Sequence, residues 1–217
     1  MKKKLLAMML MGTLIAASTA GCGTSEDGSD SEHVQEQAQS GDTQDNSQST
    51  SGDEQSGENS ENAIIIYFSW SGNTEAVAQE IQNQTGADIF KIEPQEPYTD
   101  DYDELLDIAQ NEQQEEARPA IAETVGNIED YDTVYFGYPN WWGDMPMIMY
   151  SFLDDYDLSG KVIAPFVTSG GSGFSGTLDT IQEMEPQAEV TEGLSLGSGE
   201  ADDSADAVSQ WLGEIGL

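Results

Sequence analysis

Residues 63–81 read AIIIYFSWSGNTEAVAQEI. The first six residues form a continuous apolar run, which is typical of a strand buried on both faces of a sheet. Val77, Ala78 and Ile81 follow at spacings that place them on one side of a helix. A buried strand that passes through a short polar loop into a helix indicates an α/β fold with a parallel sheet.

The same alternation continues to the end of the chain. Further strands are predicted at 87–92, 133–138, 162–168 and 188–194, and further helices at 102–117, 145–155, 176–184 and 205–215. Five strands alternating with helices predict a doubly wound five-stranded parallel sheet with helices on both faces. Pro165 lies inside a predicted strand, where a proline removes one ladder donor, and we expect a bulge to absorb it.

In open parallel sheets, ligands bind beyond the carboxyl ends of the strands. The loop after the first strand is Ser69-Trp70-Ser71-Gly72-Asn73-Thr74. It precedes a helix, so its amides lie at the positive end of the helix dipole, and its hydroxyls add further donors for a phosphate. It has neither the Gly-Lys-Ser/Thr ending of a Walker loop nor a Gly-x-Gly-x-x-Gly motif. The alternative is an ordinary helix cap by Asn73 or Thr74.

Two more unusual loops follow the third and fourth predicted strands. The second loop contains Pro139-Asn140-Trp141-Trp142-Gly143. Two tryptophans in a turn favour a flat ligand held by stacking, the alternative being that one of them covers the edge of the sheet. The third loop is Ser169-Gly170-Gly171-Ser172-Gly173-Phe174. Its glycines permit close approach of the backbone to a ligand.

These three motifs, in this order and at these strand ends, resemble the flavodoxin family from about residue 63 to the C-terminus. The resemblance implies the strand order 2-1-3-4-5 and FMN as the cofactor. Residues 69–74 would hold the FMN phosphate, residues 139–143 would flank the isoalloxazine, and residues 169–174 would meet its pyrimidine edge. Trp141 or Trp142 would lie against the ring.

The resemblance also implies an activity, namely electron transfer through the quinone, semiquinone and hydroquinone states of the flavin. The peptide at Gly143 would turn to accept a hydrogen bond from N5 of the reduced flavin. No catalytic side chain and no metal ligand is assigned: the predicted domain has no cysteine or histidine, which excludes Ser-His-Asp hydrolysis and cysteine nucleophiles, so chemistry should belong to the cofactor.

Two alternatives stay open. One is an FMN-dependent NAD(P)H:quinone or flavin reductase, for which Lys91, Arg118 and Lys161 are the only cations in the domain. The other is a lipoprotein that binds a ligand without redox chemistry.

The N-terminal part is predicted to be a signal and a tether. Residues 1–21 contain three lysines directly after Met1, followed by an apolar run that is too short to span a membrane comfortably. Thr19-Ala20-Gly21-Cys22 is similar to the lipobox of bacterial lipoproteins, which predicts a lipoprotein-type signal peptide and lipidation of Cys22. Residues 22–62 are rich in Ser, Glu, Gln and Gly and are predicted to be disordered.

This organisation leaves residues 63–217 as the flavodoxin-like domain. It predicts an extracytoplasmic protein that is lipid-anchored to the bacterial cell membrane, plain secretion being the alternative. The chain has 42 acidic and 6 basic residues, which argues against nucleic acid and anionic lipid as partners. A redox partner protein with a basic docking patch would suit this charge, although solubility alone would also explain it. We expect a monomer that contacts the membrane only through the lipid at Cys22.

Overall fold

The computed structural model describes residues 62–217, so the predicted signal peptide, the lipidation site Cys22 and the predicted tether lie outside the described residues. The strands are β1 (Ala63–Tyr67), β2 (Asp88–Lys91), β3 (Thr133–Pro139), β4 (Val162–Ser169), β5 (Glu189–Val190) and β6 (Leu194–Gly197). All pair in parallel, in the order β2-β1-β3-β4-β5, and β6 also pairs with β4. The predicted fold class and strand order are confirmed.

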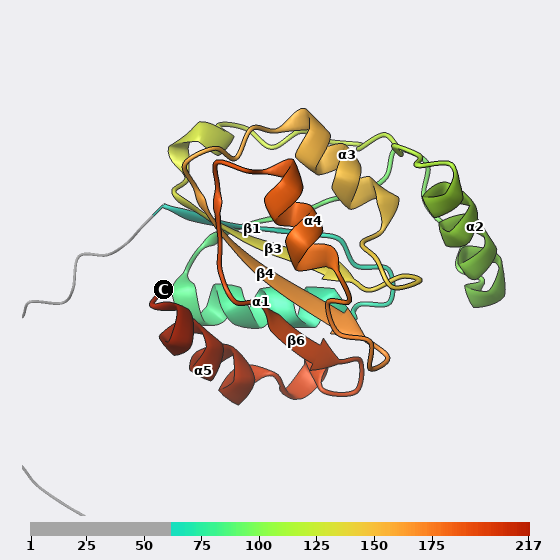
Figure 1. Cartoon of the computed structure of the whole chain (residues 1–217). Coiled ribbons are helices and arrows are strands. Elements are labelled where there is room, and N and C mark those ends of the chain that lie inside the picture. The colour runs from blue at the N-terminus through green and yellow to red at the C-terminus, as the bar shows by residue number, and fades with distance from the viewer. Residues whose placement is uncertain (1–61) are drawn as a thin grey trace, which may run out of the picture. The chain divides into compact units, whose positions relative to one another are not determined.

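The helices cover both faces of this sheet. They are α1 (Asn73–Thr85), α2 (Tyr102–Gln114), α3 (Met147–Asp155), α4 (Thr177–Met184) and α5 (Ala205–Ile215), with short 3-10 helices η1 (Ile128–Asp130) and η2 (Ala201–Asp203). Figure 1 shows α3 and α4 on one face, α1 and α5 on the other, and α2 beyond the sheet. No helix within residues 62–217 is long and apolar enough to cross a bilayer.

Alternation along β1 explains its unbroken apolar sequence. Ile64 and Ile66 belong to the hydrophobic cluster that includes residues of α3 and α4. Ile65 between them belongs to the cluster that includes residues of α1 and α5. Because successive strand residues point to opposite faces, a strand covered on both sides has to be apolar at every position.

The predicted fifth strand, at 188–194, is wrong in one respect, because the structure divides it into β5 and β6. The backbone N–H of Thr191 donates to the carbonyl of Ile163 at 2.9 Å, and pairing resumes only where Leu194 meets Phe166. In a parallel strand, residues two apart form hydrogen bonds with the same neighbouring strand, so Pro165 faces the same side as Ile163. Its missing N–H therefore lies where the pairing with the edge strand is interrupted. The edge strand therefore leaves the ladder where β4 offers no donor, in place of the expected bulge.

The two edges of the sheet have different roles. The carboxyl ends of the strands lead into the three loops singled out by the sequence. At the amino edge, Asn62 and Leu217 line a common hollow of about 390 Å³. The first described residue thus lies at the edge opposite to those loops.

Candidate functional site

All three predicted loops meet at one cavity at the carboxyl edge, with a volume of about 350 Å³. It is lined by Trp70, Ser71, Tyr102, Leu105, Leu106, Ala109, Pro139, Asn140, Trp141, Trp142, Thr168, Ser169, Gly170 and Ser198. The sequence motifs therefore share a cavity, although α2 supplies part of its wall.

The first loop leaves the amino end of α1 uncapped. The N-cap residue is Gly72, with φ 92°, and no side chain caps the helix. The hydroxyl of Ser69 is buried and accepts a hydrogen bond from the N–H of Gly72 at 3.2 Å, whereas Ser71 is exposed. The alternative of an ordinary cap by Asn73 or Thr74 is therefore wrong. Uncapped first-turn amides at the positive end of the helix dipole can receive an anion.

Thr74 joins the first loop to the end of β4. Its Oγ1 lies 2.8 Å from Oγ1 of Thr168, and both side chains are buried. A hydroxyl can donate and accept at the same time, so this pair can pass one donor on to a ligand. Thr168 was not predicted as a site residue, because it lies within an apolar strand and its sequence context gives no sign of a binding role.

The second loop contains a two-residue turn. Trp141 and Asp144 exchange backbone hydrogen bonds at 2.9 and 3.0 Å. Trp142 and Gly143 between them have φ 54° and 82°, the positive values that a type I′ turn requires. Oδ1 of Asn140 accepts a hydrogen bond from the N–H of Gly143 at 3.0 Å. A tryptophan at positive φ is uncommon, and such backbone strain is found disproportionately at ligand-binding sites.

The adjacent tryptophans have different environments. The ring of Trp141 packs edge-to-face on Phe68 at 5.4 Å and on Tyr98 at 5.5 Å. Trp142 is 51% exposed, and its Nε1 donates to the carbonyl of Leu106 in α2 at 3.0 Å. The alternative that one of the pair covers the sheet edge applies to Trp141. Trp142 is the indole presented at the cavity rim.

Internal hydrogen bonds shape the third loop. Oγ of Ser169 is buried and accepts hydrogen bonds from the N–H groups of Gly171 at 3.2 Å and Gly173 at 3.0 Å. Nδ2 of Asn140 donates to the carbonyl of Gly173 at 2.8 Å. Asn140 therefore fixes the third loop against the second, and Gly170 is left to line the cavity.

Phe174 does not line the cavity, contrary to its predicted place beside a ligand edge. Its ring lies 6.4 Å from that of Tyr138, in a T-shaped arrangement. A Cβ atom at Gly193 would lie 2.3 Å from Cζ of Phe174, so the ring fills the space that this glycine leaves. The Phe174 side chain therefore packs against the hydrophobic core.

Helix α2 contributes to the cavity, which was not predicted. Tyr102, Leu105, Leu106 and Ala109 line the cavity, and Tyr102 is 60% exposed. The apolar spacing of this helix resembles that of any helix that packs on a sheet. In the sequence, Tyr102 falls in line with Leu105 and Ala109 and so gives no separate signal; its exposure is evident only in the structure.

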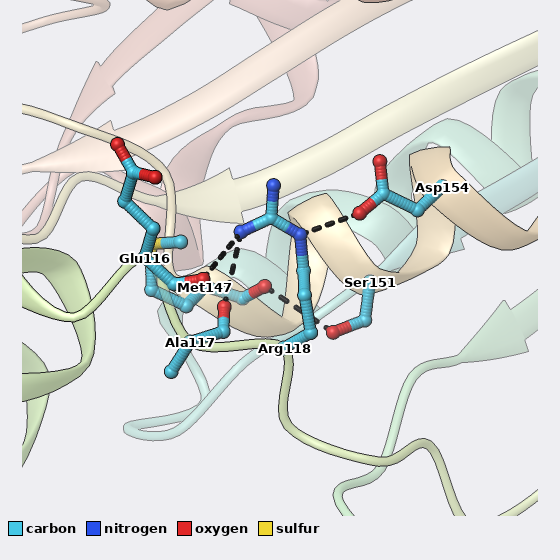
Figure 2. Close-up of polar contacts among 6 residues, drawn as sticks. All are labelled: Glu116, Ala117, Arg118, Met147, Ser151 and Asp154. Atoms are coloured by element: carbon cyan, nitrogen blue, oxygen red, sulfur yellow. Dashed lines mark hydrogen bonds and ion pairs between the residues drawn. The ribbon is translucent and has the colours of Figure 1, made fainter.

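Each cation of the described domain already has a partner away from the cavity. Nζ of Lys91 lies 2.9 Å from Oε2 of Glu75, and Lys161 donates to a backbone carbonyl. Figure 2 shows the guanidinium of Arg118 between Asp154 of α3 and the carbonyls of residues 116 and 117. An anion in the cavity would therefore be held by amides and hydroxyls.

A hydrogen bond fastens α2 to the segment that follows β2. The O–H of Tyr98 donates to Oε2 of Glu112 at 2.8 Å. Burial raises the pKa of Glu112, and the hydrogen bond from Tyr98 opposes that shift. Burial, followed by the nearby Glu112 charge, raises the pKa of Tyr98, so its proton stays on the phenol at neutral pH.

Comparisons with known proteins agree with this architecture. A family model described as Flavodoxin matches residues 62–215. Among solved structures, a protein classed as a flavoprotein from Bacteroides eggerthii is 31% identical, with a TM-score of 0.62, covering 71% of this chain and 98% of its own. One from Bacteroides uniformis is 29% identical, with a TM-score of 0.63, covering 70% and 97%.

A flavoprotein from Lactobacillus acidophilus, solved in complex with FMN, is 24% identical, with a TM-score of 0.57, covering 69% of this chain and 99% of its own. Its similarity concerns the fold. Among curated proteins, none matches this chain. Because the family model spans nearly all of the described residues, the chain belongs to the flavodoxin family.

Proposed function

We propose that this flavodoxin binds FMN in the carboxyl-edge cavity and acts as an electron carrier. FMN is the cofactor that family membership and the FMN complex of the Lactobacillus acidophilus flavoprotein support. When bound, it supplies reversible transfer of one or two electrons. The observation that carries the proposal is that Ser71, beside the uncapped end of α1, and the exposed Trp142 line one cavity.

The phosphate would be bound by the first turn of α1. The available donors are the hydroxyl of Ser71 and the first-turn amides of residues 73 and 74, since the N–H of Gly72 already donates to Ser69. Among residues 62–217, no cation lines the cavity. Uncharged donors at a helix amino end suit a phosphate, because the dipole supplies the complementary charge. Thr168 would keep the Thr74 hydroxyl oriented.

The isoalloxazine would lie against Trp142. Trp142 and Gly143 form a turn with positive φ at both residues. Asn140 forms hydrogen bonds with this turn and with the third loop, and so holds the two together. Gly170 would bring its backbone to the polar edge of the ring. The inner side of the cavity, formed by Trp141 and Leu105, would exclude water from the ring.

Electrostatics would disfavour a further negative charge in the site. The chain carries a formal net charge of −36, and the cations of the described residues are engaged elsewhere. An acidic surround raises the free energy of an anionic cofactor, which lowers the potential for its second electron.

A reductase that uses NAD(P)H is the second candidate, since exposed aromatic rings could also frame a substrate. The engagement of Lys91, Arg118 and Lys161 with other groups argues against it, because a nucleotide phosphate would have to displace those partners. Rapid turnover of NADPH and a quinone by the purified FMN-loaded protein, without an added reductase, would favour the enzyme.

We propose that the physiological partner is a redox protein with a basic docking patch, reached at the outer face of the cell membrane. The acidic composition and the lipobox-like sequence ending at Cys22 support this. Replacing Cys22 by serine is expected to move the protein from the membrane fraction to the soluble fraction. Retention of the serine variant in the membrane would contradict the lipid anchor, and soluble wild-type protein would favour plain secretion.

Titration with FMN tests the cofactor and the role together. The purified protein is expected to quench FMN fluorescence at one site and to bind riboflavin, which lacks the phosphate, more weakly. Ser71→Ala should weaken FMN binding and leave riboflavin binding unchanged. Stepwise reduction should proceed in two separate one-electron steps. Failure to bind FMN would favour a ligand-binding lipoprotein without redox chemistry, and a single two-electron step would contradict the carrier role.

A further inference from the structure

Two large hydrophobic side chains are exposed among the described residues, and both line the same cavity. They are Tyr102, at 60%, and Trp142, at 51%. Water-exposed aromatic surface is unfavourable in the free protein, so two such rings at the rim of one cavity mark a surface that a ligand covers. Trp142 has a role in the proposed function, but Tyr102, on a different element, does not.

The position of Tyr102 is fixed by the start of α2. The preceding residue, Asp101, is the N-cap, and its Oδ1 accepts a hydrogen bond from the N–H of Glu104 at 2.9 Å. The indole of Trp70 lies beside the phenol ring, with the centroids 6.2 Å apart and the planes tilted by 42°. Nε1 of Trp70 donates to the carbonyl of Thr99 at 2.8 Å. The helix cap and Trp70 therefore fix the position of the Tyr102 ring, while most of its surface remains exposed to solvent.

The same helix positions the other exposed ring. Trp142 donates its indole N–H to the carbonyl of Leu106, about one turn along α2 from Tyr102. The spacing between the two rings is therefore set by one rigid element. Within residues 62–217, no group accepts a hydrogen bond from the Tyr102 hydroxyl, and the ring contact with Trp70 leaves 60% of Tyr102 exposed.

The third loop offers no aromatic side chain to the cavity. Phe174, its one aromatic residue, packs against Tyr138 and the space above Gly193. Among the described residues, the aromatic side chains that line the cavity are Trp70, Tyr102, Trp141 and Trp142. Trp141 already packs on Phe68 and Tyr98, and Trp70 is half-buried beside Tyr102, so Tyr102 is the exposed ring that can give a flat ligand at Trp142 a second aromatic surface. Tyr102 is the aromatic residue of α2 and lies on the cavity wall.

We propose that Tyr102 is a second aromatic contact for the isoalloxazine ring, so that α2 forms one wall of the flavin site. This inference rests on the proposed binding of FMN. It assigns Tyr102 to the ring and not to the phosphate, which the first loop would hold. The contact is apolar and aromatic, so phenylalanine can replace tyrosine there, whereas leucine, which is apolar but has no ring, cannot provide the stacking.

Parallel titrations with FMN and riboflavin test the assignment. Tyr102→Leu is expected to weaken the binding of both by the same factor, about 3- to 10-fold, as loss of one aromatic contact implies. Tyr102→Phe should bind both within about 2-fold of the wild type on the same scale. Ser71→Ala is the matched control, since it should weaken FMN binding alone. The bound flavin should also fluoresce more strongly in Tyr102→Leu, because an electron-rich quencher has been removed.

The outcomes separate this inference from the proposed function. If wild-type protein binds neither flavin, both are overturned. If wild-type protein binds FMN and Tyr102→Leu binds both flavins with unchanged affinity and emission, only the assignment of Tyr102 is overturned. A loss confined to FMN would place Tyr102 at the phosphate and would also overturn it. Thermal unfolding of the flavin-free variants should match the wild type, and a lower melting temperature in Tyr102→Leu would indicate a structural role instead.

Discussion

The aromatic residues beside the cavity form two regions that differ in packing. The inner wall is Trp141 together with Phe68 and Tyr98, which pack on it without lining the cavity; the three rings meet edge-to-face with centroids 5.4 to 5.8 Å apart. The outer rim consists of Tyr102 and Trp142, which are mostly open to solvent. Rings that are packed edge-to-face away from solvent stabilise the fold, whereas rings that are mostly exposed to solvent remain available to a ligand. The inner wall should therefore govern stability and the outer rim affinity.

The largest expected effect is on the inner wall. Trp141→Ala should lower the free energy of unfolding by about 3 kcal/mol, because the ring leaves a cavity between Phe68 and Tyr98. Trp142→Ala should lower it by less than about 1 kcal/mol, since its ring is half exposed. Urea denaturation of the flavin-free proteins measures both values. Equal losses in the two variants would break the distinction between the regions.

The next effect concerns affinity at the outer rim. Trp142→Ala should weaken FMN binding by about 1–3 kcal/mol, roughly 5- to 150-fold, as loss of a stacking surface implies. Trp142→Phe should recover part of this loss. Fluorescence titration gives the dissociation constants, and an unchanged constant for Trp142→Ala would mean that the exposed indole does not contact the ring.

A smaller effect is expected where the inner wall meets α2. Tyr98→Phe removes the hydrogen bond to Glu112 and keeps the ring, so it should cost about 1 kcal/mol of unfolding free energy. FMN affinity should change less than in Trp142→Ala. Amide hydrogen exchange should accelerate first in α2, because this hydrogen bond fastens that helix. Exchange that is unchanged in α2 would show that other contacts hold the helix.

The smallest effect should depend on pH. Burial raises the pKa of Glu112 above its ordinary value of 4.5, so folding favours the protonated carboxyl. That stabilisation is present at low pH and is lost as the pH rises through the raised pKa. Glu112→Gln, which keeps an acceptor for Tyr98, should therefore be at least as stable as the wild type at pH 7. The difference in stability between the two proteins should vanish at pH values below the ordinary pKa of a glutamate. A stability difference that grows as the pH is lowered would contradict this prediction.

Much of the fold could be predicted because local patterns and the architecture agree. The apolar run of β1 and the amphipathic helix after it specify a strand–helix unit without reference to distant residues. The split of the predicted fifth strand was harder to foresee. It depends on which neighbour the missing N–H of Pro165 faces, and that side is set by the register between β4 and its partners.

The candidate site could be predicted only where its residues follow strands directly. All three predicted loops reach the cavity, since parallel strands bring their carboxyl ends to one edge. The different environments of Trp141 and Trp142 could not be predicted. Residues of a helix or strand can be assigned to a face from their spacing, whereas adjacent residues of a turn cannot. The spacing of Leu105 and Ala109 predicted an apolar helix face but not the partner of that face.

The hollow shared by Asn62 and Leu217 has a practical consequence. An attachment made through residues that precede Asn62 reaches the domain at the amino edge and leaves the carboxyl edge clear. A conducting support or a fused reductase joined there would leave the aromatic rim facing the bulk solution. If the protein is the electron carrier proposed above, the immobilised form should therefore exchange electrons with dissolved mediators more readily than with the support itself.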